Sequence, residues 1–268
     1  MTVLAVRGAG SLKGSAPLVP ASTTPLVLLH AFPLSSAMWV RVEAELPDLP
    51  ILEIDLPGAG LSPTVEPVGI DSAARAVAAS LGELGVTRAV IAGVSMGGYV
   101  AMSLLRQVPE LFAGVALMHT KATVDTPEVR AGRLATAREV LRTGSVASLR
   151  PMASKLISAE SAAADPGLAP QLERWILEAT PAGVAWAAQA MAGRADSLAA
   201  LRTFGTEALV VAGEADPFTS VAEAEEMMDA LGWDAVFALF AGVGHLSPLE
   251  APNALARTLR GFYRSAIG

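Results

Sequence analysis

The sequence contains no cysteine, and this absence excludes several kinds of site at once. Without a thiol, the chain can have no disulfide framework, no cysteine nucleophile and no thiolate ligand for a metal. Charged residues make up only 17% of the chain and the formal net charge is −7. Because nucleic-acid binding requires a basic face, we expect no nucleic-acid partner. The three histidines show no metal-ligand spacing with carboxylates, so we also expect no cofactor.

Long apolar runs are missing as well. No uninterrupted stretch approaches the ~18 apolar residues that a membrane span requires. The first ten residues also lack the apolar core of a signal peptide. Hydrophobic residues nevertheless make up 52% of the 268 residues, enough to bury a sizeable core. We therefore expect a cytoplasmic protein without membrane association, either a monomer or a homodimer.

Short apolar runs recur along the chain and alternate with helical patterns. Near-continuous apolar strands that alternate with helices indicate a parallel sheet covered on both faces, an α/β fold. A helix is expected after a cap at Asp71 or Ser72, and the last helix is expected to begin near Pro252. The expected strands are residues 26–29, 51–56, 89–94, 113–118, 208–212 and 236–240.

Residues 121–202 interrupt this alternation. The segment is rich in alanine and shows no convincing strand. We interpret it as a helical cap inserted into a core domain made of residues 1–120 and 203–268. The alternative is that its helices extend the main helical layer. The expected helices are residues 127–142, 146–157, 168–179 and 182–192.

Ser95 lies in the sequence Gly-Val-Ser-Met-Gly-Gly, between the strand expected at 89–94 and a helical stretch. A G-x-S-x-G pattern between a strand and a helix is typical of a nucleophile elbow, a tight turn that exposes the serine hydroxyl above a sheet edge. The glycines fit this interpretation, because a strained turn packed against its neighbours leaves no room for a Cβ. We predict that Ser95 is a nucleophile.

A serine nucleophile needs a base, and the base needs an orienting carboxylate. His245 follows the last expected strand in a glycine-containing loop, and Asp216 follows the strand at 208–212. Asp125, after an earlier strand, is an alternative acid. We interpret His30 as structural and His119 as packed or capping rather than catalytic.

The order Ser95, Asp216, His245 is that of α/β-hydrolases, and four motifs carry the resemblance. They are HAFP at residues 30–33, DLPGAGLS at 55–62, the elbow, and the two loops that hold Asp216 and His245. The chain resembles the capped esterases, enol-lactonases and haloperoxidase-like members of that family along nearly its full length. It departs from the family pattern at Ala31 and Ala59, where glycine and histidine are usual. The family's first two strands are hard to find before Pro25.

The resemblance implies an α/β-hydrolase fold, a mostly parallel sheet flanked by helices, and an acyl-enzyme mechanism. Ser95, Asp216 and His245 would form the triad, and backbone N–H groups of Phe32 and Met96 the oxyanion hole. Activity should rise with pH as the histidine base loses its proton.

The side chains expected around this site are mainly apolar, which favours an uncharged or weakly polar acyl group. Cap arginines, among them Arg133 and Arg194, are interpreted as solvated, although one that pointed inward would suit an anionic enol-lactone. The aromatic and methionine side chains of the cap could equally form the core of the cap itself. The expected pocket residues are Leu34, Phe218 and Leu246, together with Met152, Trp175, Trp186 and Met191 from the cap.

The sequence thus predicts a serine esterase or lactonase that acts on a small-molecule substrate. Three alternatives remain open. The same triad could use peroxide, as a cofactor-free perhydrolase or haloperoxidase does. It could cleave a C–C bond, or it could persist in a ligand receptor that turns over slowly. The fold alone does not choose among them.

Overall fold

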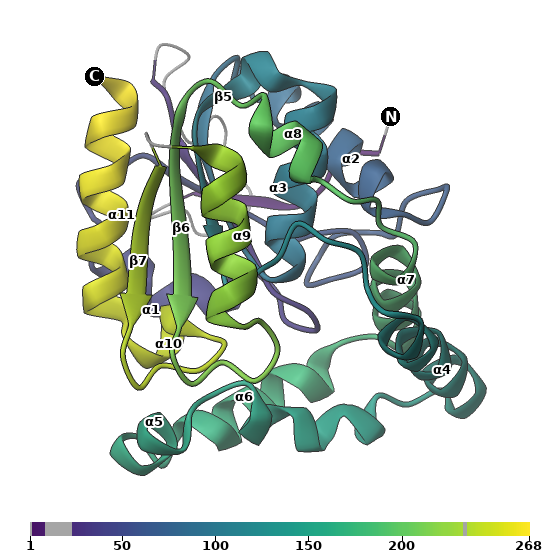
Figure 1. The fold of residues 1–268 in the computed structure, drawn as a ribbon. Coiled ribbons are helices and arrows are strands. Elements are labelled where there is room, and N and C mark those ends of the chain that lie inside the picture. Colours follow the sequence, from purple (N-terminus) through teal and green to yellow (C-terminus); the bar gives the residue numbers. More distant parts are fainter. Residues whose placement is uncertain (1, 9–22, 233–234) are drawn as a thin grey trace.

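A seven-stranded sheet forms the centre of the molecule (Figure 1). The computed structural model describes residues 2–8, 23–232 and 235–268. Neighbouring strands are parallel except at one edge, where the first strand is antiparallel to its neighbour. In spatial order the strands are β1 (Val6–Gly8), β3 (Ile51–Ile54), β2 (Leu26–Leu29), β4 (Ala89–Val94), β5 (Phe112–Met118), β6 (Glu207–Gly213) and β7 (Ala235–Phe240).

The six strands expected from apolar runs are confirmed, with β3 ending two residues earlier than predicted. The central strands β2, β4 and β5 are buried throughout, which is why they lack a polar–apolar alternation. The sequence did not reveal β1, because three residues with an exposed Arg7 are too short to show a strand pattern. Residues 9–22, also part of the segment before Pro25, lie outside the described residues.

Helices cover both faces of the sheet and form two hydrophobic clusters with it. The first cluster joins the face that carries Val27 and Leu29, and the second joins the face that carries Leu26 and Leu28. One face is covered by α2 (Ile70–Glu83), α3 (Met96–Gln107), α8 (Leu198–Arg202) and α9 (Val221–Leu231), and the other by α1 (Val40–Ala44), α10 (Ser247–Glu250) and α11 (Pro252–Ile267).

The expected start of α2 was wrong. The helix begins at Ile70, and its N-cap is Gly69, which contributes no side-chain capping bond. Asp71 lies inside the first turn and accepts hydrogen bonds from Ser103 and Arg106 of α3 instead. A tertiary partner has therefore replaced the local capping role that aspartate often takes.

The chain between β5 and β6 is helical, and the part of it that includes α5 and α6 lies beyond the carboxyl ends of β6 and β7 (Figure 1). The helices expected there are confirmed, but the stretch with Pro151 inside it is a 3-10 helix. Proline lacks the N–H that an α-helix interior uses. Within the described residues, no helix combines the length and hydrophobicity needed to span a membrane. The elements are α4 (Pro127–Thr143), η3 (Ala147–Lys155), α5 (Ala159–Ala164), α6 (Leu168–Glu178) and α7 (Pro181–Ala192).

Candidate active site

Ser95 occupies a strained turn between β4 and α3. Its backbone has φ 54° and ψ −111°, a conformation that non-glycine residues rarely adopt. The Ser95 N–H donates to the carbonyl of Met118 on β5, and the Thr120 hydroxyl donates to the Ser95 carbonyl. Hydrogen bonds to the neighbouring strand and the segment after it therefore hold the strained residue in place.

The glycines around Ser95 are required by close backbone approaches. A Cβ at Gly93 would overlap the carbonyl of Gly97, and one at Gly97 would overlap the carbonyl of Leu29 on β2. A Cβ at Gly98 would lie 2.6 Å from the side chain of Thr120. The sequence-based explanation of these glycines is thus confirmed.

Asp216 and His245 are hydrogen-bonded at the same edge of the sheet, in the loops after β6 and β7. The distances from His245 Nδ1 to the two carboxylate oxygens of Asp216 are 2.9 and 2.8 Å. Burial by itself raises the pKa of Asp216, but hydrogen bonds from His119 and His245 outweigh it and hold that pKa below its usual value. Asp216 is therefore a carboxylate that accepts a hydrogen bond from the imidazole.

His119 also lies against Asp216, at the end of β5. Its Nδ1 is 3.2 Å from Asp216 Oδ2, and its Nε2 is 2.7 Å from the Ser247 hydroxyl. The ring is fully buried, and burial lowers the pKa of His119 despite the carboxylate beside it. The sequence-based interpretation of His119 as packed or capping missed this contact.

Ligand atoms of His119, Asp216 and His245 all lie within 4.8 Å of one another, a spacing that could also hold a metal ion. Hydrogen bonds account for this arrangement without an ion, because the Nδ1 atom of each ring already faces an Asp216 oxygen. The cluster is therefore best described as one carboxylate shared by two imidazoles.

Further donors fix the Asp216 carboxylate. The N–H groups of Phe218 and Thr219 donate to Oδ1, and the Thr219 hydroxyl donates to Oδ2 at 2.6 Å. The Phe218 ring lies over His245, with their centroids 5.0 Å apart. Hydrogen bonds thus hold Asp216 and His245 in a fixed relative position.

Glu250 holds the loop that carries His245. Its carboxylate accepts hydrogen bonds from the N–H groups of Gly244 and Leu246, which flank the histidine, and from Ser158 after η3. The His245 N–H donates to the carbonyl of Leu156. The histidine loop is therefore anchored both to α10 and to the segment between β5 and β6.

His30 has the structural role expected of it. Its Nε2 accepts a hydrogen bond from the Leu56 N–H, and its Nδ1 lies 3.0 Å from the carbonyl of Ala31. Burial lowers the pKa of His30, so the ring is neutral. Asp55 has the local turn role expected of it, because its carboxylate accepts from the N–H groups of Ser36 and Leu61.

The N–H groups predicted for the oxyanion hole belong to Met96, which directly follows Ser95, and to Phe32, which follows β2. Met96 is the first residue of α3, where N–H groups have no partner within the helix. Phe32 lies two residues after His30, in the loop that the His30–Leu56 hydrogen bond ties to the segment just after β3. Within the described part of the chain, neither N–H donates to another protein group. Their role in an oxyanion hole stays a prediction.

The expected pocket residues fall into two groups. Leu34, Leu246, Trp186 and Met191 are buried in the hydrophobic clusters, whereas Phe218 is 40% exposed. The Trp186 indole donates to the carbonyl of Val65, which fixes α7 against the core. Met152 and Trp175 are partly buried against the second cluster. Which of these side chains contacts a substrate stays a prediction.

The alternative acid, Asp125, is paired elsewhere. Arg133 and Arg194 each place a guanidinium nitrogen 2.7 Å from one of its oxygens. Burial raises the pKa of Asp125, but these two ion pairs outweigh it and lower the pKa overall. The interpretation of Arg194 as solvated was wrong, since the residue is 7% exposed and its guanidinium stacks on Tyr99.

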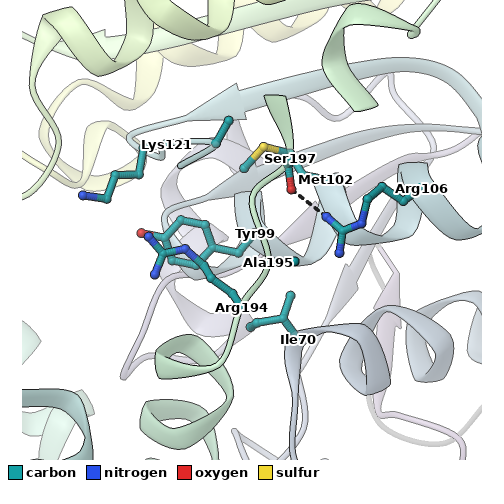
Figure 2. Close-up of a pocket in the computed structure, with 9 residues that line it drawn as sticks. Ile70, Tyr99, Met102, Arg106, Lys121, Arg194, Ala195 and Ser197 are labelled. Carbon is teal, nitrogen blue, oxygen red and sulfur yellow. Dashed lines mark hydrogen bonds between the residues drawn. The ribbon is translucent and has the colours of Figure 1, made fainter. Parts of the chain in front are cut away.

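Figure 2 shows a small pocket beside Arg194. Three cations line it, and each has an acidic partner: Arg106 pairs with Asp71, Lys121 with Glu223 and Arg194 with Asp125. Ser95, Asp216 and His245 are not among its lining residues. Because its charges are already compensated, this pocket does not indicate a binding site for an anion.

The topology brings Ser95, His119, Asp216 and His245 to the same edge of the sheet, since β4, β5, β6 and β7 are consecutive neighbours and parallel. Among the described residues, no hydrogen bond joins the Ser95 hydroxyl to His245. Catalytic hydrogen bonds are often long in ligand-free proteins, so this does not remove His245 as the base. Because His245 Nδ1 contacts Asp216, Nε2 is the nitrogen left to face a serine.

Comparisons with known proteins agree with this architecture. The model of the alpha/beta hydrolase family matches residues 26–258. A solved thermophilic esterase from Thermogutta terrifontis has a TM-score of 0.89 and 30% identity, covering 98% of this chain and 93% of that one. An enol-lactonase structure from Burkholderia xenovorans has a TM-score of 0.83 and 24% identity, covering 97% and 95%, and at that identity it shows the fold alone.

Curated relatives include the 3-oxoadipate enol-lactonase 2 of Acinetobacter baylyi, 26% identical over 85% of this chain and 84% of its own length. Lipase LipV of Mycobacterium tuberculosis is 33% identical over 41% of this chain. The matches to LipV and to a 2-succinyl-6-hydroxy-2,4-cyclohexadiene-1-carboxylate synthase of Enterobacter span only 42% and 35% of those proteins. Esterase and lactonase relatives together support an enzyme that hydrolyses esters.

The family match covers more than half of the chain, and the parallel sheet, the serine turn and the Asp–His pair occur in the expected order. The chain belongs to the alpha/beta hydrolase family.

Proposed function

We propose that this protein is a serine hydrolase that cleaves carboxylic esters or lactones through an acyl-enzyme on Ser95. The observation that carries the proposal is the buried Asp216–His245 hydrogen bond at the sheet edge where the strained Ser95 turn also lies. The printed names of the esterase and enol-lactonase relatives support the ester class of substrate.

In the first step, His245 Nε2 accepts the Ser95 proton as the serine oxygen attacks the acyl carbon. The carbonyl π bond opens, and the resulting oxyanion receives hydrogen bonds from the Phe32 and Met96 N–H groups. The N-terminus of α3 adds a favourable dipole there. Asp216 stabilises the imidazolium and keeps its Nδ1–H directed inward.

To complete acylation, His245 gives its proton to the departing alcohol, and the acyl group remains attached to Ser95 as an ester. Water then transfers a proton to His245 and attacks the acyl carbon, and the proton returns to Ser95 as the acid is released. For a lactone the alcohol and the acid remain in one molecule. His245 is therefore neutral at the start of each half of the reaction and protonated while each tetrahedral intermediate exists.

We further propose that residues 121–202 form a cap over this site. Three contacts support it: Ser158 bonds to Glu250, Leu156 bonds to the His245 backbone, and Trp186 bonds to Val65. The inserted segment thus touches both the histidine loop and the core, so a movement of the cap would be felt at the catalytic base.

The test uses aryl esters of increasing acyl length alongside small lactones. Ser95→Ala should lower kcat by a factor on the order of 10⁴ to 10⁶, and Asp216→Asn by about 10⁴. Ser154→Ala, at an exposed serine of η3, is the matched control and should retain full activity. Turnover by Ser95→Ala at the wild-type rate would refute the mechanism.

A phosphonate probe offers an independent check, because it labels an activated serine without any need for the true substrate. Mass spectrometry should find the adduct on Ser95 in the wild type and no adduct in Ser95→Ala. The rate of labelling should rise with pH as the histidine base loses its proton. A labelling rate that stayed flat from acid to alkali would argue against a histidine base.

A further inference from the structure

Asp216 contacts two imidazoles, and the reaction proposed above uses only one. His245 and His119 reach the carboxylate from neighbouring loops, with ring centroids 5.9 Å apart. The far nitrogen of His119 contacts Ser247, a fully buried hydroxyl two residues after the catalytic histidine. Asp216, His119 and Ser247 therefore form a buried chain of hydrogen bonds. It ends two residues from His245, the other imidazole that contacts Asp216.

The protons in this chain can be assigned from chemistry. An ionised carboxylate only accepts hydrogen bonds, so His119 must carry its proton on Nδ1. A neutral imidazole then has an acceptor at Nε2, and the Ser247 hydroxyl is the donor that this acceptor faces. A buried ring without solvent contact stays neutral more readily than charged.

We propose that His119 is a positioning residue: a neutral second histidine that holds the Oδ2 side of Asp216, with its tautomer fixed by Ser247. The inference rests on the proposed function, because Asp216 is the carboxylate of that mechanism. His119 touches neither the nucleophile nor the acyl group in this scheme and acts through Asp216.

The backbone supports a specific role for this residue. His119 has φ 47°, in the left-handed region that a non-glycine residue enters at some energetic cost. The ring also packs closely against β6: a Cβ at Gly213 would overlap the carbonyls of Gly244 and Val243 and would lie 3.1 Å from His119 Cε1. The ring is therefore held in a close-fitting position by a backbone conformation that is rare for histidine.

The hydrogen bond from His119 should weaken the electrostatic effect of the Asp216 carboxylate on His245. With His119 in place, part of the Asp216 charge is satisfied at Oδ2, and the rest faces His245. Without it, the carboxylate would stabilise the imidazolium form of His245 more strongly. Glu250 is bonded to the backbone on both sides of His245, and Glu214 accepts from Gly242 earlier in the same loop, so neither carboxylate would change.

Two substitutions of nearly equal shape separate this role from packing. In His119→Asn, the amide nitrogen can take the position of Nδ1 and keep a donor on Asp216. His119→Leu has the same branching and no donor, and both variants lose the Ser247 contact. Asparagine is also the better residue at positive φ, so thermal unfolding is measured for both to show that each is folded.

We expect kcat/KM to fall about 10- to 100-fold in His119→Leu, the range of a lost hydrogen bond to a charged group, and about threefold in His119→Asn. The loss should lie in kcat rather than KM. The acid limb of the pH–rate profile should move upward by about half to one pH unit in His119→Leu only. Equal losses in the two variants, or an acid limb that stays in place or moves downward, would overturn the proposal.

A measurement on the wild type keeps the inference testable if His119→Leu does not fold. Because the chain has only three histidines, the imidazole nitrogens can be followed individually by ¹⁵N NMR. We expect His119 to hold its proton on Nδ1 near neutral pH. An Nε2–H tautomer or an imidazolium at His119 would overturn the inference. An inactive wild type would instead count against the proposed function, and the tautomer would still be decided.

Discussion

Single residues in this chain show how burial sets protonation, and Glu53 is the clearest case outside the site. Its side chain on β3 is 3% exposed, and Arg7 approaches it only to 3.9 Å. Burial, followed by repulsion from Glu43, raises the pKa of Glu53 to about 8. Near neutral pH the folded protein therefore tends to hold a proton that an unfolded chain would release.

This makes stability depend on pH in a defined direction. A raised folded-state pKa favours folding fully below the unfolded value of 4.5, and the contribution is lost as pH rises toward about 8. Glu53→Gln carries no charge to bury, so it should unfold at higher denaturant than the wild type in alkaline solution. We expect a gain of about 3 kcal/mol at about pH 9 and little change at about pH 4.

Denaturant unfolding at several pH values measures this gain. The exposed Glu45, also outside the site, serves as the control, and Glu45→Gln should show no comparable pH-dependent gain. If the Glu53→Gln gain were the same at about pH 4 and about pH 9, burial of the carboxylate would not be its cause.

At the residue scale, the sequence predicted the hydrogen-bonded pair Asp216 and His245 and the strained turn at Ser95, but not the further partners of Asp216. Ser95, Asp216 and His245 could be found because each follows a strand whose apolar run is visible. His119 also follows such a strand, and that position was the available signal. Its contact with Asp216 depends on β5 lying beside β6, a pairing that a sequence pattern does not display.

At the scale of elements, loops are positioned by acceptors that serve several backbone donors. Glu250 is the main example, with three N–H groups within 2.8 to 2.9 Å of its carboxylate. It lies five residues after His245, and nothing in the local pattern distinguishes it from a surface glutamate. The Asp55 carboxylate likewise accepts from two backbone N–H groups. Its role in a turn could be predicted, because its partner Leu61 is close in sequence.

Glu250→Gln should loosen the histidine loop. The amide replaces one acceptor oxygen with an NH₂ group that must face a backbone donor, and the remaining bonds lose their charge. We expect a loss of about 1–3 kcal/mol in stability and roughly tenfold in kcat. Denaturant unfolding and ester hydrolysis measure the two effects.

The matched control for this change is Glu214→Gln. Glu214 accepts a single hydrogen bond from Gly242 in the same loop, and the residue is exposed. Its substitution should change stability by less than about 0.5 kcal/mol. Similar losses in both variants would mean that general loop charge, rather than the three-donor anchor, positions His245.

At the scale of the whole molecule, the alternation of apolar strands and helices was enough to predict the sheet, and the alanine-rich stretch was enough to predict the helices between β5 and β6. Where that segment touches the core could not be predicted. Contacts such as Trp186 to Val65 join residues 121 positions apart, and they depend on how far α7 can approach the loop after β3.

Gly58 and Gly183 determine how closely α7 can approach the loop after β3. A Cβ at Gly58 would lie 2.6 Å from the Cα of Gly183, and a Cβ at Gly183 would overlap the Gly58 carbonyl. Backbone thus meets backbone where α7 crosses the loop, without space for a methyl group. Gly183→Ala must push the helix away or distort the loop, because no flexible side chain can yield.

The same substitution elsewhere should have the opposite sign. Gly132 lies in an exposed part of α4, with no atom near its Cβ position, and Gly132→Ala should raise stability by up to about 1 kcal/mol through helix propensity. Gly183→Ala should lower it by about 1–3 kcal/mol. If residues 121–202 cover the active site as proposed, Gly183→Ala should also change KM for the longer esters, and Gly132→Ala should not. A stabilised Gly183→Ala would show that α7 is not packed against the loop, whereas a destabilised variant with an unchanged KM would separate the packing of α7 from any role as a lid.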